Sequence, residues 1–540
     1  MELPLLLPPW APSLAAVLAT ALLLLLLTVL RRRLSKRSAT RNRKYNLPPG
    51  PRPWPVIGNL DLIGTLPHHS IHDLSKRYGP LMSLRFGSVP VVVGSSVDSA
   101  RFILKTHDLA FIDRPKMASG QHTAYNFSDI VWSPYGAYWR QARKLWQTRL
   151  FSARQLRSQE HVRDEEVRAM LRGLSSSSSS GSAQQVAIKE HLIMLSLNVI
   201  SRVALGGKYV VVGEGGTAGS SPVSPEEFRW MVEELFVLNG VFSVGDFIPW
   251  LSWLDPQGYV GRMKRLAKMF DRFLEHVVDE HEERRRREGE GFVAKDMVDL
   301  LLELADDPSL EVPIGRDGIK GFALDLIAGG TDTSAVTVEW AMSELLRNPS
   351  AMAKATEELD AVVGRGRVVT EQDIPRLPYL EAVVKETFRL HPVTPLLAPR
   401  LSREDASMDS SGHDIPAGTL VFVNVWTIGR DPAVWGDAAS EFRPERFVGS
   451  GVDVKGQHLE LLPFGSGRRM CPGIGLGLKM VQVTLANLLH AFAWRLPDGV
   501  TAEELSMEEK FGLAVPRKVP LVAVAEPRLP ARLYDAATGP

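Results

Sequence analysis

Hydrophobic residues recur with helical spacing in most long segments of this 540-residue chain. Apolar positions three and four apart predict helices over residues 319–347, 350–363, 380–390 and 475–494. Strand-like runs are shorter and lie at 81–86, 89–93 and 420–425. The pattern therefore predicts a mostly α-helical protein with small β-sheets.

The N-terminus carries a different hydrophobic pattern. Residues 14–30 form an apolar run without charge, near the lower limit of about 17–25 residues for a membrane-spanning helix. Eight lysines and arginines follow by position 44, and only Glu2 is charged before the run. A cleaved signal peptide would carry its basic residues ahead of the run instead. We therefore expect residues 1–44 to be a single transmembrane anchor with a basic stop-transfer segment, and everything after it to be cytosolic.

The remainder divides simply. Residues 45–56 are rich in proline and predict a stiff, extended hinge. Residues 57–540 lack an obvious second linker, so we expect one catalytic domain. Within it, residues 175–180 and 213–225 have the low complexity of surface loops. The charged run at 281–288 predicts a solvated helix end.

Composition narrows the chemistry. The net charge is +1, so no overall field favours nucleic acid, and we expect no nucleic-acid partner. The single cysteine excludes an internal disulfide, and without context a lone cysteine is usually a small buried residue. No CxxC or CxxCH pattern occurs, which excludes zinc ribbons, iron–sulfur clusters and c-type haem.

The surroundings of that cysteine are specific. Gly465 and Gly467 allow tight turns before Cys471, and a predicted helix begins near residue 475, so the helix dipole favours a thiolate. A single thiolate fits the axial position of a haem iron better than a structural metal site. The pattern Phe-x-x-Gly-x-Arg-x-Cys-x-Gly of the cytochrome P450 superfamily is met at every fixed position, namely Phe464, Gly467, Arg469, Cys471 and Gly473.

The chain thus resembles cytochromes P450 over almost its whole length. The segments 132–140, 452–456 and 507–512 resemble plant microsomal members, in particular a flavonoid 3′-hydroxylase-like group. The resemblance implies the cytochrome P450 fold, with haem b between a distal and a proximal helix. It also implies Cys471 as the iron ligand, with Phe464, Arg469 and Gly473 at the cofactor.

The predicted helix 319–347 contains the second motif. Gly329 and Gly330 lie in its middle and cost about 1 kcal/mol each relative to alanine, which suggests that a flat ligand approaches there. Thr333 can donate to the carbonyl of Gly329 and bend the helix. An isolated Asp-Thr is usually a satisfied polar patch. The resemblance instead implies that Asp332 and Thr333 are an acid–alcohol pair that relays protons to bound dioxygen.

Two further motifs complete the pattern. Glu386 and Arg389 share a helix face, and the resemblance implies a buried ion network with Arg446 rather than a surface pair. Trp139 and Arg143, four residues apart, could both donate to one haem propionate. The resemblance makes Arg400 another propionate partner.

These features predict an NADPH- and O2-dependent monooxygenase of a lipophilic plant secondary metabolite, of phenolic, terpenoid or steroid type. Partner and location follow from the resemblance: NADPH–cytochrome P450 reductase, because no dinucleotide motif follows a strand here, and the endoplasmic reticulum membrane. The expected substrate contacts lie at 118–130, 322–328, 393–397 and 511–514. Two alternatives stay open: a haem-thiolate isomerase or dehydratase that does not use O2, and a non-enzymatic haem- or sterol-binding membrane protein.

Overall fold

A computed structural model of the protein describes residue 20 and residues 45–178, 185–209 and 222–535. The predicted anchor, apart from Thr20, and most of the predicted loop 213–225 lie outside these residues. The described helices, apart from short 3-10 and π-helical turns, are α2 (Pro67–Tyr78), α3 (Val97–Arg101), α4 (Ala118–Thr123), α5 (Ala137–Leu145), α6 (Ala153–Ser158), α7 (Glu160–Ser178), α8 (Ile188–Leu205), α9 (Pro225–Gly240), α10 (Val244–Phe247), α11 (Tyr259–Glu288), α12 (Met297–Ala305), α13 (Arg316–Arg347), α14 (Pro349–Val363), α15 (Pro378–Leu390), α16 (Val425–Ile428), α17 (Pro432–Trp435), α18 (Ile474–Ala491) and α19 (Arg532–Asp535).

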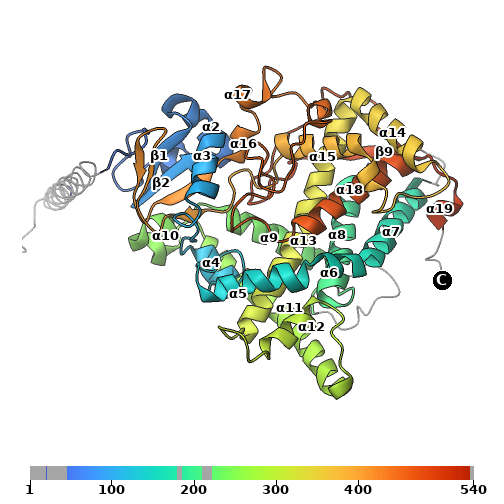
Figure 1. Ribbon diagram of the computed structural model, residues 1–540, viewed down its shortest axis with the longest axis horizontal. Coiled ribbons are helices and arrows are strands. Elements are labelled where there is room, and N and C mark those ends of the chain that lie inside the picture. The colour runs from blue at the N-terminus through green and yellow to red at the C-terminus, as the bar shows by residue number, and fades with distance from the viewer. Residues whose placement is uncertain (1–19, 21–44, 179–184, 210–221, 536–540) are drawn as a thin grey trace, which may run out of the picture.

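Three small sheets accompany the helices. The largest has the strand order β1 (Leu81–Phe86), β2 (Val89–Gly94), β7 (Leu420–Val423) and β4 (Arg400–Leu401), with β2 and β7 parallel and the other neighbours antiparallel. The second has the order β3 (Gln185–Ala187), β9 (Val522–Pro527) and β8 (Phe492–Arg495). The third is the hairpin of β5 (Ala406–Met408) and β6 (His413–Ile415). The four-stranded sheet lies at one end of the molecule, and α7, α14 and α19 lie toward the other (Figure 1).

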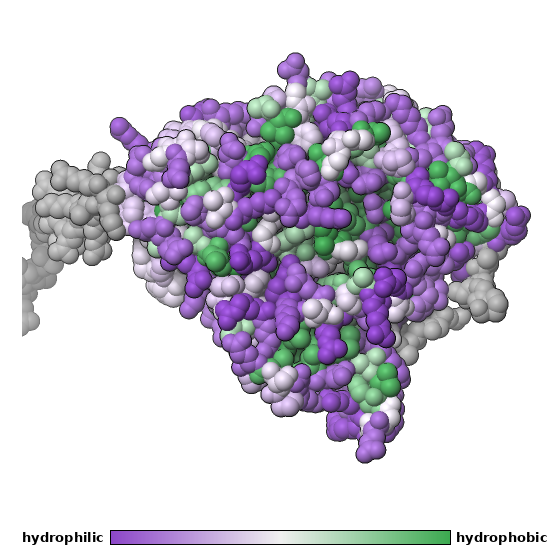
Figure 2. Space-filling model, in the orientation of Figure 1, coloured by the Kyte–Doolittle hydropathy of each residue, from purple (hydrophilic) through white to green (hydrophobic). Residues whose placement is uncertain are grey.

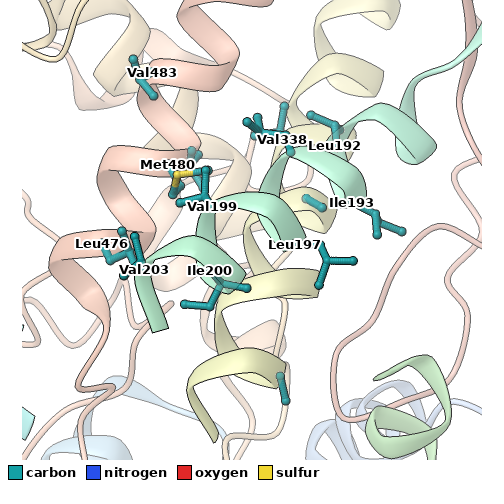
Figure 3. Packing of buried hydrophobic residues seen from close by; sticks show 14 of the residues in the cluster. Leu192, Ile193, Leu197, Val199, Ile200, Val203, Val338, Leu476, Met480 and Val483 are labelled. Carbon is teal, nitrogen blue, oxygen red and sulfur yellow. The ribbon is translucent and has the colours of Figure 1, made fainter. Parts of the chain in front are cut away.

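The helix α13 occupies the middle of the helical part (Figure 1). It is buried along most of its 32 residues, as expected for a helix with apolar residues on all sides. It packs against α8 and α18, where Ile200, Val338 and Met480 belong to one hydrophobic core (Figure 3). A Cβ atom on Gly330 would lie 2.7 Å from the side chain of Ile200. Gly330 therefore serves the packing of α8 on α13, whereas the sequence suggested an approaching ligand.

The predicted helices and strands agree closely with the structure, with one clear error. The predicted helices at 319–347, 350–363 and 380–390 correspond to α13, α14 and α15, and the predicted strands to β1, β2 and β7. The helix predicted at 475–494 ends early, at Ala491. Residues Phe492–Arg495 form β8 instead, because they pair with β9 about 30 positions away.

The predicted hinge is attached to the body. The Tyr45 hydroxyl donates to Asp405 (2.8 Å), and the Asn46 N–H donates to Asp414 (2.8 Å) beside the β5–β6 hairpin. Residues 175–178, predicted as loop, are the end of α7. The charged run 281–288 is the end of α11, as predicted, although His281 within it is buried. The face shown in Figure 2 is mostly hydrophilic, with separate hydrophobic patches.

Candidate haem-thiolate site

The cysteine loop is shaped by two glycines in front of α18. Gly465 and Gly467 have φ angles of +69° and +73°, in the left-handed region that favours glycine. A Cβ atom on Gly467 would lie 2.3 Å from the carbonyl oxygen of Leu104, so glycine also permits this close approach. The Cys471 N–H donates to the Phe464 carbonyl at 2.9 Å. The loop is thereby closed, with Cys471 at its end.

The side chain of Cys471 lines a cavity of about 290 Å³ between this loop and α13. Gly329 and Thr333 of α13 line the same cavity, and the Thr333 hydroxyl donates to the Gly329 carbonyl at 2.8 Å, as predicted. Burial raises the pKa of the Cys471 thiol, while the N–H of Gly473 and the cation of Arg143 lower it. Burial outweighs these two groups, so the helix end does not by itself favour the thiolate as the sequence suggested. A bound metal ion would deprotonate a coordinating thiol outright.

The two members of the predicted acid–alcohol pair have different surroundings. Thr333 lines the cavity, but Asp332 does not. Asp332 is buried, and Lys189, Glu233 and Lys510 act on its charge. Burial raises the pKa of Asp332 to about 6. The Lys189 and Lys510 ammonium groups each lie 3.6 Å from Glu233, so Asp332 stands between the cavity side of α13 and a partly exposed ion cluster.

Four arginines gather at one side of the cavity. Arg114, Arg143, Arg400 and Arg469 all line it, and among the described lining residues they are the only charged side chains. Burial lowers the pKa of each arginine. The pKa of Arg469 falls to about 9, because the nearby cation of Arg400 adds to the effect of burial. Such crowding of cations, of which Arg114 and Arg400 are buried and Arg143 and Arg469 half-buried, calls for anions. Two carboxylates of a bound group would supply them, so these residues fit the propionates of haem.

The arginines already have partial partners. Arg400 donates to Asp108 (3.1 Å) and to the Ser466 carbonyl (3.1 Å). Arg469 donates to the carbonyls of Ile112 (3.0 Å) and Ser133 (2.7 Å). The sequence-based assignment missed Arg114 and Asp108. In the sequence, both are simply polar residues near the apolar stretch 109–112. Such an arrangement is too common to indicate a site.

The predicted aromatic contacts are also at the cavity. The Trp139 indole N–H donates to the Ile130 carbonyl at 3.1 Å, and the Arg469 guanidinium lies 4.3 Å from the centroid of its ring system. Phe464 lines the cavity below α13 and meets Phe388 edge to face, with ring centroids 5.4 Å apart. The structure therefore brings Trp139, Arg143, Arg400, Phe464, Arg469 and Cys471 around one cavity.

The predicted ion network is buried. Glu386 and Arg389 are at most 1% exposed, and Arg389 binds both carboxylate oxygens of Glu386 at 2.6 and 2.7 Å. The Arg446 Nε adds a third bond at 2.9 Å. Arg389 also donates to the carbonyls of Gly429 and Glu441. The network therefore fixes the chain between α15 and the cysteine loop, and the alternative of an exposed surface pair is wrong.

Comparison with known proteins identifies the family. The family model described as cytochrome P450 matches residues 48–523. The chain belongs to the cytochrome P450 family. It is 53% identical over 520 residues to trimethyltridecatetraene synthase of Zea mays, covering 93% of this chain and 92% of that protein. It is 52% identical to dimethylnonatriene synthase of Zea mays (92% and 94% covered) and 45% identical to flavonoid 3′-monooxygenase of Petunia hybrida (90% and 93% covered).

A solved structure shows the same fold. A zebra fish cytochrome P450 in a structure with abiraterone superposes with a TM-score of 0.71 at 24% identity, covering 86% of this chain and all of that one. The protein is thus a cytochrome P450 monooxygenase with relatives among plant enzymes. Family membership implies a haem iron cofactor, dioxygen, a reductase partner and a small-molecule substrate.

The substrate side of this P450 cavity is apolar. Of the four regions expected to contact substrate, three reach it, through Ile130, the segment Val393–Leu397 and Leu513. The region 322–328 does not line it: Phe322 packs against Tyr138 and Trp146 instead. A smaller apolar cavity adjoins through Thr394, Leu397 and Leu513 and extends to Trp132, Asn239 and Phe422.

Proposed function

We propose that this P450 uses NADPH and O2 to oxidise a lipophilic secondary metabolite of terpenoid type, at haem b ligated by Cys471. The supporting observation is the cavity that has the cysteine sulfur on one wall, Thr333 on the other and the four arginines at one side. Bound haem would supply dioxygen activation and the transfer of one oxygen atom to the substrate. Arg143, Arg400 and Arg469 would hold its carboxylates, together with Trp139.

The chain's own groups have separate tasks in this reaction. Thr333 would hold and pass a proton at the face of α13, since its hydroxyl lies in the cavity and is oriented by the Gly329 carbonyl. Asp332 would exchange protons with solvent through the partly exposed Lys189–Glu233–Lys510 cluster. This chain has both the acid, Asp332, and the alcohol, Thr333, which an isomerase or dehydratase that does not use O2 would not need.

A terpenoid is favoured over a flavonoid by two observations. The lining away from the arginines is largely aliphatic, and two of its hydroxyls, those of Thr333 and Thr337, already donate to backbone carbonyls, which leaves few donors for a polyhydroxylated ring system. The two synthases, whose names denote acyclic hydrocarbons, share 53% and 52% identity with this chain, against 45% for the Petunia flavonoid enzyme. Flavonoid hydroxylation is the second candidate because of those flavonoid relatives.

We further propose a single-pass location in the endoplasmic reticulum membrane, with residues 1–44 as anchor and the catalytic domain in the cytosol. The supporting feature is the charge-free run 14–30 followed by eight basic residues. Within the described residues, α18 is long and apolar enough to cross a membrane, but it is mostly buried in the core. It packs in the interior of the fold and not against lipid.

The proposal can be tested with the full chain in microsomes that contain NADPH–cytochrome P450 reductase. Farnesol, naringenin and progesterone represent the terpenoid, flavonoid and steroid classes, and products are read by mass. We expect NADPH-dependent oxidation of farnesol. We also expect the reduced protein with bound carbon monoxide to show the absorption band typical of a thiolate-ligated haem. Cys471→Ser should lose both. A Cys471→Ser protein that keeps the band would refute the ligand, and oxidation of naringenin alone would refute the terpenoid class.

A further inference from the structure

A short segment next to the cavity is held in an unusual way. We call residues 128–133 the strap. It runs between α4 and α5, and Ile130 and Val131 within it line the cavity. The strap is not part of a helix or strand, so its backbone groups need other partners in the interior.

Two carboxylates, the buried Asp129 and the half-buried Asp325, accept the N–H groups of the strap in turn. The Asp325 side chain, on α13, accepts from Ile130 at 2.8 Å and from Val131. Asp129 accepts from Trp132 at 2.9 Å and from Ser133. Four consecutive N–H groups thus end on carboxylate oxygens, and the bond from Ile130 to Asp325 spans 195 positions of sequence.

The carbonyl groups of the strap face the other way. The Ile130 carbonyl accepts from Trp139, and the Val131 carbonyl from Arg114 (2.9 Å). The Ser133 carbonyl accepts from Arg469. These three donors belong to the cationic side of the cavity. The strap therefore joins the Asp325 carboxylate of α13 to residues that would hold the haem propionates.

The helix is shaped to receive the strap. A Cβ atom on Gly321 would lie 3.3 Å from the Ser128 carbonyl oxygen and 3.4 Å from the Asp129 nitrogen. A Cβ atom on Gly318 would lie 2.8 Å from the Tyr138 hydroxyl, which itself donates to the Ser128 carbonyl. Gly318, Gly321 and Asp325 follow one another along one side of α13, at the spacing of helical neighbours.

Backbone strain lies just ahead of the strap. Tyr125, Asn126 and Phe127 have φ angles of +47°, +53° and +65°. Three consecutive non-glycine residues in this region cost roughly 1–2 kcal/mol each, and such strain persists only where neighbouring contacts hold it. The strap, which follows these three residues directly, holds their backbone in place from the C-terminal side.

We propose that Asp325 is a positioning residue: its carboxylate holds the strap against α13 and so fixes Ile130 and Val131 where a substrate meets them. It does not line the cavity and makes no substrate contact itself. The inference rests on the proposed function in so far as this cavity takes a substrate. Its structural part, the order of the strap, does not depend on which substrate is used.

The protonation of the pair agrees with this role. Burial raises the pKa of Asp129 to about 7, and burial together with the charge of Asp129 raises the pKa of Asp325 well above its usual value. A neutral carboxyl group still accepts two N–H bonds. An asparagine at position 325 keeps one acceptor oxygen of the same shape, and an alanine keeps none.

The experiment compares full-length holoenzymes with Asp325→Asn, Asp325→Ala and Asp317→Ala. Asp317 is the matched control, because it is an exposed carboxylate on the same helix. Hydrogen–deuterium exchange of a peptide covering the strap, the Kd of farnesol from its spectral shift, kcat and KM are measured, after the carbon monoxide band has confirmed intact haem ligation. Exchange reports the strap directly, and Kd and KM report its effect on substrate.

For Asp325→Ala we expect strap exchange at least about tenfold faster, and Kd and KM raised about tenfold, because two N–H groups lose their acceptor. Asp325→Asn should stay within about threefold of the wild type, since one acceptor remains. An alanine variant whose strap exchange and Kd equal those of Asp317→Ala overturns the inference. Absence of a farnesol shift in the wild type would count against the proposed substrate, while the exchange measurement would still decide the role of Asp325.

A second variant answers the same question if Asp325→Ala does not fold. Asp325→Leu removes both acceptor oxygens but fills about the same space. Leucine is also a good helix former, so the helix should not be weakened. Faster strap exchange and a higher Kd than in Asp325→Asn support the inference, and values equal to those of Asp325→Asn overturn it.

Discussion

Asp332 adjoins the threonine that faces the cavity, yet it is enclosed by α13 and the ion cluster around Glu233. Its carboxyl group has a pKa of about 6 because burial disfavours the charged form. The unfolded chain releases this proton at a lower pH, so between about pH 4 and pH 6 the folded protein binds more protons than the unfolded one. Stability contributed by this group therefore falls as pH rises through that window.

Replacing Asp332 by asparagine removes a buried charge from the folded protein. At pH 8 we expect the free energy of unfolding to rise by about 2–3 kcal/mol, while product formation falls because the proton donor is lost. The advantage should be smaller at pH 5, where the wild-type carboxyl is mostly protonated. Thermal unfolding of the holoenzyme at both pH values, with turnover measured in parallel, checks this expectation.

The matched control is Asp317→Asn, which changes an exposed carboxylate on the same helix and should shift stability by no more than about 0.5 kcal/mol. An Asp332→Asn protein that unfolds at a lower temperature than the wild type at pH 8 would show that the carboxylate is stabilised by its neighbours. In that case burial would not be the dominant influence on this group.

At the scale of elements, the two central glycines of α13 have different reasons to be glycine. Gly330 faces Ile200 of α8 at a distance that leaves no room for a Cβ atom, whereas a Cβ atom on Gly329 would meet nothing within 4 Å. Gly329 lines the cavity opposite Cys471. One glycine therefore serves helix packing, and the other serves the space above the cysteine.

Alanine at each position separates these reasons. Gly330→Ala should destabilise the protein by about 1–3 kcal/mol through overpacking against Ile200. Gly329→Ala should leave stability unchanged or raise it by up to about 1 kcal/mol, because alanine favours the helix, while narrowing the cavity and altering the Kd of farnesol. Thermal unfolding and the spectral titration measure the two effects.

A double substitution provides the check on Gly330. Ile200→Ala removes the atoms that the new methyl group would meet, so Gly330→Ala with Ile200→Ala should cost less than the sum of the two single changes. Strict additivity of the two costs would mean that the helices separate without strain. The assigned role of Gly330 would then be wrong.

Sequence patterns anticipated the elements and site residues whose signal is local. The periods of α13 and α15 are each contained within about 30 residues, and both helices were placed correctly. The cysteine motif is equally local, and its residues Phe464, Arg469 and Cys471 line one cavity. Three features depend on distant partners: β8 pairs with β9, Arg114 meets the cavity through the fold, and Asp325 reaches Ile130 across the chain. An aspartate in an apolar helix or an arginine before a proline carries no local mark of such contacts, so the sequence alone could not assign them.

The whole molecule combines a catalytic body with a predicted anchor, and the boundary between them can be located from contacts. Tyr45 and Asn46 already bind Asp405, Asp414 and Gly412, so the body begins at about residue 45 and not after the proline-rich segment. The 44 residues before it contain the apolar run and its basic flank. Membrane attachment and haem binding should therefore be separable by truncation.

A chain that starts at Tyr45 should fold, bind haem and show the thiolate–carbon monoxide band, because it keeps the contacts to the β5–β6 hairpin. It should be largely released from microsomes by carbonate, whereas the full chain should stay in the pellet, since about 17 apolar residues are enough to span the bilayer. A chain that starts at Asn59 loses the Tyr45 and Asn46 contacts and should yield less holoenzyme. Retention of the Tyr45 chain in the pellet to the same extent as the full chain would place the principal membrane attachment on the body itself. Digestion of the body by protease in intact microsomes would establish that it faces the cytosol, as the basic residues after the run require.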